Sequence, residues 1–127
     1  MASDADLANE FFQVKRHGDI AVIVPSPQVE HLPETLLQPA AQMVLAPLKD
    51  DPPNQIIVDL SGVGYFGSAF ITFLLRCHHL LADRGSDLAL AGVNRNIREL
   101  LRITNLEMYW PLYDTVKEAM QALGGAD

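Results

Sequence analysis

"IIVDLSGVGYFGSAFITFLL", residues 56–75, passes from a strand pattern to a helix pattern and thereby decides the fold. Residues 56–60 form a short, nearly continuous apolar run, which is typical of a strand that is covered on both faces. Residues 69–84 have a helical pattern, and Gly85 ends it because glycine readily adopts the left-handed conformation that follows many helices. The polar and glycine residues are confined to the join between the two patterns, where Ser68 stands immediately before the helix.

The chain before this join predicts a hairpin and then a helix. Residues 11–16 and 19–24 are short β-like runs on either side of His17 and Gly18, a connection that suits two antiparallel strands. Apolar residues then recur at helical spacing over residues 32–48.

The chain after the join repeats the alternation. Residues 86–93 indicate a second buried strand, Asn94 is placed to cap a helix over residues 95–103, and a last helix follows residue 114. Strands that alternate with helices predict an α/β fold, with a single mixed β-sheet and helices packed mainly on one side. We expect one domain over residues 1–127, with residues 1–9 and 124–127 frayed.

Composition restricts the function. A chain of 127 residues with 49% hydrophobic and 20% charged residues fits one ordinary domain. A single cysteine, no basic amino-terminal segment leading into an apolar stretch, and no apolar run of about 18 residues predict a cytoplasmic protein without a membrane span. The net charge of −7 disfavours direct binding of nucleic acid.

The motifs of the common enzyme classes are missing around Ser68. A nucleophile elbow needs glycine two residues before and two residues after the serine, where this chain has Phe66 and Phe70. The side chains of His78 and His79 diverge by about 100° on a helix, so they do not form a paired metal-ligand face. We therefore expect no catalytic residues, no cofactor and no metal, with weak nucleotide binding left open.

The motifs along the chain resemble a known family. The order of a strand, VDLSGV, an aromatic residue, a serine-led helix, RG, LALAGV, IRELLRITNLE and YDTVKEAMQAL is similar to the sulphate transporter and anti-sigma factor antagonist (STAS) domain. The resemblance covers nearly the whole chain, with its specific part in residues 58–123. It implies a sheet with helices on one side and a domain that binds a partner protein.

In many STAS proteins that antagonise anti-sigma factors, a serine kinase phosphorylates the first serine of an Asp-Ser-Ser-Gly or Asp-Ser-Thr-Gly motif. The motif falls here on Gly67-Ser68-Ala69-Phe70, so only the serine is retained. The resemblance makes Ser68 the candidate phosphorylation site. An acidic residue often precedes the first helix in this family, and Glu30 is the nearest candidate here.

Ser68 also has a purely structural interpretation. A serine at the start of a helix accepts hydrogen bonds from free backbone amides and contributes about 1 kcal/mol. The same amides and the positive helix end would favour a phosphate, which adds a charge of roughly −1.5 to −2 at neutral pH. The two interpretations are compatible, because phosphorylation would use the geometry that capping requires.

The helix after Ser68 carries two apolar stripes. One stripe contains the positions that the family buries, Ile71, Leu74, Leu75 and Ala82. If this stripe faces the sheet, as the resemblance implies, Phe70 and Phe73 are left toward solvent or a neighbouring helix; the alternative is that both phenylalanines are core residues. On the first interpretation, replacing both phenylalanines with serine would weaken partner binding and leave the fold intact. The expected partner-binding residues are Gly67, Ser68, Ala69, Phe70 and Phe73.

These observations predict a non-enzymatic, protein-binding regulator similar to anti-sigma factor antagonists. Its unphosphorylated helix end would bind an anti-sigma factor that is also a serine kinase and so free the sigma factor, and phosphate on Ser68 would weaken that contact. The alternative is a constitutive STAS subunit of a transport complex or a stress-signalling scaffold. A homodimer is left open.

Overall fold

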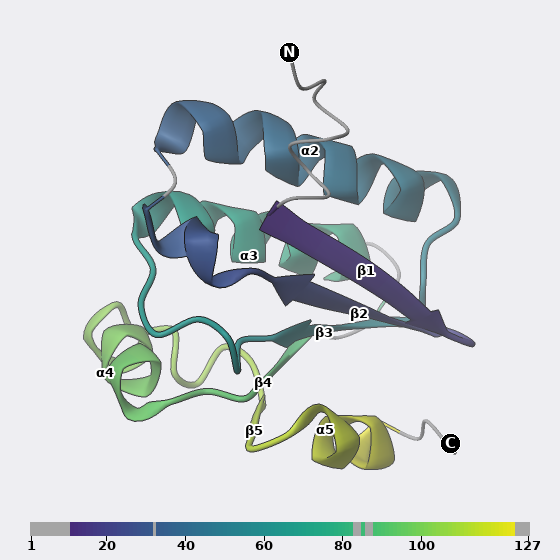
Figure 1. The fold of residues 1–127 in the computed structure, drawn as a ribbon. Coiled ribbons are helices and arrows are strands. Elements are labelled where there is room, and N and C mark those ends of the chain that lie inside the picture. The colour runs from purple at the N-terminus through teal and green to yellow at the C-terminus, as the bar shows by residue number, and fades with distance from the viewer. Residues whose placement is uncertain (1–10, 32, 83–84, 86–87, 124–127) are drawn as a thin grey trace.

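The computed structural model describes residues 11–31, 33–82, 85 and 88–123 (Figure 1). They form one five-stranded sheet in the order β1-β2-β3-β4-β5. The strands are β1 (Phe12–His17), β2 (Ile20–Pro25), β3 (Gln55–Asp59), β4 (Leu88–Ala91) and β5 (Leu112–Tyr113). The helices are the 3₁₀ segment η1 (Pro27–His31), α2 (Glu34–Asp50), α3 (Ser68–Ala82), α4 (Arg95–Ile103) and α5 (Val116–Ala122). The expected frayed ends, residues 1–9 and 124–127, lie outside the described residues.

The first two strands form the predicted hairpin, but its connection lies one residue later than the predicted His17 and Gly18. Strands β1 and β2 pair antiparallel, and His17 lies opposite Ile20, so Gly18 and Asp19 alone make the connection. Gly18 has φ +62°, the left-handed backbone that two-residue hairpin turns require at their first position.

The other strand pairs are parallel, because each connection crosses over the sheet through a helix. Helices α2 and α3 lie together over one face of the sheet, and α5 covers part of the other (Figure 1). Alternate residues of β3 serve the two faces: Ile56 and Val58 belong to the larger core, and Ile57 to the smaller one with Ala119 of α5. The expected α/β fold, with one mixed sheet and helices mainly on one side, is confirmed.

The expectation that Phe70 and Phe73 lie on the surface is wrong. Each side chain is 1% exposed. The ring of Phe70 lies 4.8 Å from that of Phe66, and the ring of Phe73 lies 4.8 Å from that of Phe12, measured between centroids. Aromatic rings at such distances attract one another beyond the burial of their area. Helix α3 therefore turns its phenylalanine stripe toward the sheet, where β1 and the loop before α3 supply aromatic partners.

The other apolar stripe of α3, which was expected to face the sheet, is only partly buried. Leu74 is buried, as expected, but Ile71 and Leu75 are half-buried and Ala82 is exposed. The helix is apolar over most of its circumference, so periodicity alone favours neither stripe. Among the described residues, no helix is both long enough and apolar enough to cross a bilayer.

Candidate functional site

The loop of residues 60–67 leaves β3 at its carboxyl end and leads into α3. Three of its side chains are anchored in the core, since Leu60 and Phe66 are 0% and Val63 is 1% exposed. The amide of Val63 donates to the carbonyl oxygen of Leu60 at 3.0 Å and closes a turn. The exposed residues of the loop are therefore attached to buried neighbours, and buried apolar contacts of this kind oppose local opening.

Two polar side chains tie this loop to neighbouring segments. The carboxylate of Glu30 in η1 accepts a hydrogen bond from the amide of Gly64 at 3.2 Å. The side-chain amide of Asn94 donates to the carbonyl oxygen of Val63 at 3.2 Å, while its oxygen accepts from the amide of Ile97 at 2.8 Å and caps α4. The structure thus brings Glu30 to the loop and confirms Asn94 as a cap, with a second bond that local sequence reasoning missed.

The connection from β4 to α4 packs closely beneath the same loop. The amide of Leu60 donates to the carbonyl oxygen of Ala91 at 2.7 Å. Gly92 has φ +69°, and a Cβ atom there would lie 2.7 Å from the backbone nitrogen of Ser61. Only glycine fits this contact without displacing the loop. The sequence signal for it is a glycine directly after a buried strand, which marks a close approach of backbone.

Ser68 lies at the helix start, as predicted, where it is the first residue of α3, and it is exposed. The carbonyl oxygen of Gly67 accepts from the amides of Phe70 and Ile71 at 3.2 and 3.3 Å, so Gly67 occupies the capping position. Within the described residues the hydroxyl of Ser68 has no hydrogen-bond partner, so the expected side-chain cap is not formed. Ser68 is exposed, so its hydroxyl is accessible from solvent.

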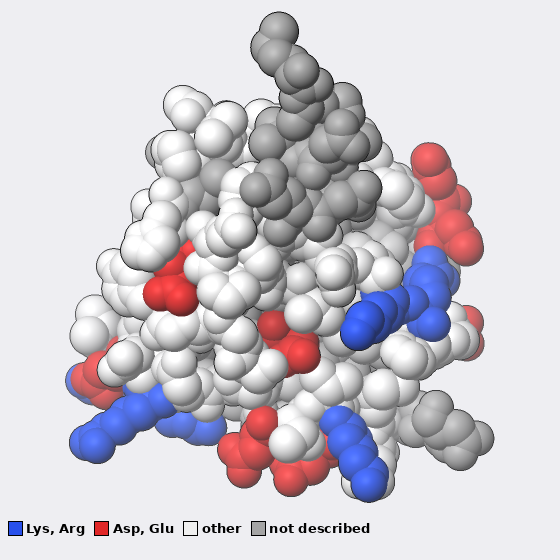
Figure 2. Space-filling model, viewed as in Figure 1, with Lys and Arg blue, Asp and Glu red and all other residues white. Residues whose placement is uncertain are grey.

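We use the name loop–helix surface for the exposed residues of the loop and of the helix start: Ser61, Gly62, Tyr65, Gly67 and Ser68. Tyr65 is its largest side chain and is 56% exposed. The first turn of α3 contains no acidic residue, so no carboxylate of its own compensates the positive helix end. On the face in Figure 2, basic side chains lie at the margins rather than over the loop that leads into α3.

The described residues offer little for catalysis. Cys77 is fully buried, and this burial raises the pKa of its thiol, which disfavours the reactive thiolate. His78 accepts a hydrogen bond from the indole N–H of Trp110 at 3.2 Å, a packing role. In the described part of the chain, no three His, Cys, Asp or Glu side chains come together as metal ligands.

The family of the chain follows from comparison with known proteins. The model of the STAS domain matches residues 12–119, and the chain belongs to this family. No curated protein matches the sequence significantly.

Several solved structures share the fold. An anti-sigma-factor antagonist (STAS) domain protein from Planctomyces limnophilus is 29% identical, with a TM-score of 0.76 over 89% of this chain and 97% of that one. An anti-sigma factor antagonist from Mycobacterium paratuberculosis is 22% identical, with a TM-score of 0.72 over 87% and 91%. The Bacillus anti-sigma factor antagonist SpoIIAA, in its unphosphorylated form, is 15% identical, with a TM-score of 0.76 over 91% and 98%.

Proposed function

We propose that this chain is a non-enzymatic, protein-binding regulator of the anti-sigma factor antagonist type, and that the loop–helix surface contacts its partner. The observation that carries the proposal is that this surface is exposed while the loop that bears it is held in place by buried side chains and by hydrogen bonds to neighbouring segments. Val63 and Phe66 anchor the loop in the core, and Glu30 and Asn94 tie it to its neighbours. A surface that is ordered before binding loses less entropy when a partner docks.

The start of α3 is sterically open to another protein. A Cβ atom at Gly67 would meet no atom within 4 Å, so a partner backbone can approach the helix end there. The side chain of Phe70 points into the core, so the phenylalanine that replaces the family's glycine does not obstruct the approach. Gly67, Ser68 and Ala69 remain in the proposed contact, whereas the buried rings of Phe70 and Phe73 support it from below.

We further propose that phosphorylation of Ser68 switches this contact. The unphosphorylated surface binds an anti-sigma factor with serine kinase character and so releases the sigma factor. This function requires a cytoplasmic location for the chain. The exposed hydroxyl of Ser68 lies at a helix end where free amides stabilise a phosphate. The added charge of roughly −1.5 to −2 opposes docking, because it must be desolvated within the interface. SpoIIAA, which shares the fold, has been solved in unphosphorylated and phosphorylated forms.

We expect Ser68→Asp to weaken partner binding at least about tenfold, whereas Ser68→Ala binds nearly as the native protein does. A carboxylate at the helix start is compatible with the fold, so the loss reports the interface. The measurement is affinity capture from an extract of the protein's own host, with mass spectrometry of the bound proteins. Gln121→Glu is the matched control, because it adds one negative charge at an exposed position of α5.

The result distinguishes the switch from the protein contact itself. Capture of an anti-sigma factor or a kinase-like protein by all variants alike would end the switch mechanism, as would native protein without phosphate on Ser68 under every growth condition. That result would favour the alternative, a constitutive subunit of a transport complex or a stress-signalling scaffold. The departures from the family motif at Gly67 and Ala69 support this second candidate.

A further inference from the structure

A cavity of about 680 Å³ lies between α2 and α3, away from the loop–helix surface. Gln42, Leu45 and Lys49 line it from α2, and Arg76, His79 and Leu80 line it from α3. Its volume is within the range of small-molecule sites, roughly 300–1,000 Å³. Arg76 follows Ser68 by eight residues, which places the cavity about 12 Å farther along α3.

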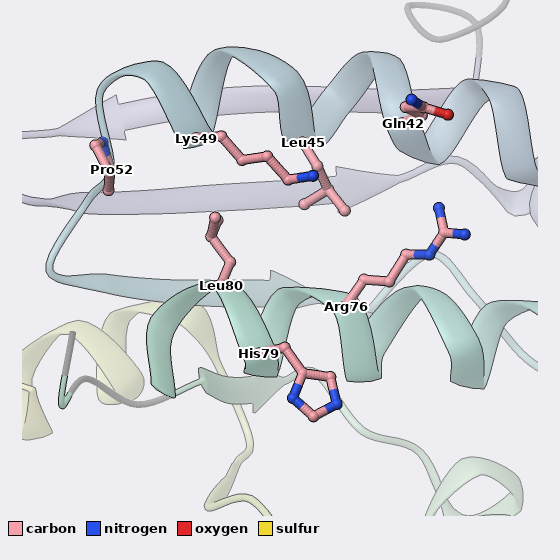
Figure 3. Close-up of a pocket in the computed structure, with 7 residues that line it drawn as sticks. All are labelled: Gln42, Leu45, Lys49, Pro52, Arg76, His79 and Leu80. Carbon is pink, nitrogen blue, oxygen red and sulfur yellow. The ribbon is translucent and has the colours of Figure 1, made fainter. Parts of the chain in front are cut away.

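Positive charge gathers in this cavity. Figure 3 shows the side chains of Lys49 and Arg76 reaching into the space between the helices, with the imidazole of His79 at the far margin of α3. Neither Lys49 nor Arg76 forms an ion pair with any residue that the structure describes, and no described acidic side chain lines the cavity. The chain has only nine lysines and arginines and a net charge of −7, so two cations that lack an acidic partner among the described residues point to an anionic occupant of the cavity.

The wall of the cavity between the helices is apolar. Both leucines line the cavity; Leu45 is 3% exposed, and Leu80 is half-buried. In Figure 3 the side chains of both leucines project into the gap below Lys49. An occupant that satisfies the whole site therefore carries an apolar body next to its anionic group.

We infer that this cavity binds a phosphate group attached to an apolar body. The guanidinium of Arg76 pairs with two phosphate oxygens through its planar fork, and the ammonium of Lys49 supplies a second positive charge from the facing helix. Gln42 adds an amide that donates and accepts hydrogen bonds at the rim. Either a phospholipid headgroup or a free organic phosphate supplies this chemistry.

Calorimetric titration of the whole chain tests the site with three probes: hexyl phosphate, inorganic phosphate and hexanol. We expect hexyl phosphate to bind at least about tenfold more tightly than either of the others, because it alone engages both the cations and the leucines. Absence of hexyl phosphate binding at millimolar concentration would overturn the inference. Equal binding of hexanol would overturn it as well, since the cavity would then be merely apolar.

Paired variants locate the binding. The double substitution Lys49→Ala and Arg76→Ala is expected to weaken hexyl phosphate binding at least about tenfold, since each cation contributes a charge-assisted hydrogen bond. The matched control is Arg95→Ala with Arg98→Ala, which removes the same charge from exposed positions of α4 and leaves binding within about twofold. Equal losses in the two double variants would contradict the proposed site.

Vesicles separate the two sources of the phosphate. The phosphate belongs to a lipid headgroup if the protein sediments with phosphatidylglycerol vesicles but not with phosphatidylcholine vesicles. The Lys49/Arg76 variant must then lose this sedimentation. Binding of hexyl phosphate without vesicle binding identifies a free organic phosphate. Vesicle binding that the Lys49/Arg76 variant retains contradicts the site as the lipid contact.

Discussion

Phe70→Ala is expected to destabilise the protein by about 3–5 kcal/mol, a large part of the roughly 5–15 kcal/mol that holds a domain folded. The side chain is 1% exposed, and its ring lies within 5.4 Å of those of both Phe66 and Phe73, measured between centroids. Truncation removes this contact area and leaves a cavity between α3 and the sheet. Chemical denaturation measures the loss, with the single tryptophan, Trp110, as a buried fluorescent probe.

Tyr65→Ala is the matched control for this substitution. Tyr65 is an aromatic residue of the same loop–helix region but is 56% exposed, so its truncation is expected to cost less than about 0.5 kcal/mol. Similar stability of the two variants would mean that Phe70 is not a core residue. The orientation of α3 described above would then be wrong.

Gly92→Ala is expected to destabilise the protein by about 2–5 kcal/mol, from the left-handed backbone and from overpacking together. The added Cβ would lie 2.7 Å from the backbone nitrogen and 2.9 Å from the Cα of Ser61, and backbone atoms move aside only if the whole loop shifts. The same denaturation experiment measures this effect.

Gly18→Ala separates the two contributions. Gly18 has φ +62°, close to the +69° of Gly92, but a Cβ there would meet no atom within 4 Å. Its substitution by alanine is expected to destabilise the protein by about 1–2 kcal/mol, the cost of the left-handed backbone alone. The two alanine variants should therefore differ, and equal losses would show that the contact between Gly92 and Ser61 carries no cost.

The sheet and its connections are predictable from sequence because their signals are local. The apolar run of β3, the glycine of the hairpin and the cap at Asn94 each depend on residues close together in the chain. The position of Ser68 at the start of α3 follows in the same way, since the change from strand to helix pattern is visible over residues 56–75.

Which face of α3 packs against the sheet is not predictable in this way, because two faces of the helix are apolar. The choice depends on Phe12 and Phe66, which come from β1 and from the loop before α3 and offer aromatic partners to Phe70 and Phe73. The bonds from Glu30 and Asn94 to the loop join residues about 30 positions apart, and no local pattern encodes such contacts. The cavity between α2 and α3 depends in the same way on how two helices pack.

The central claim is that the loop–helix surface contacts a protein partner, and hydrogen–deuterium exchange of the native complex tests it most directly. The complex captured from the protein's own host is compared with the free chain, amide by amide. We predict slower exchange over residues 61–69 in the complex and unchanged exchange in α5, on the opposite face of the sheet. Protection confined to α5, or no change over residues 61–69, would contradict the claim.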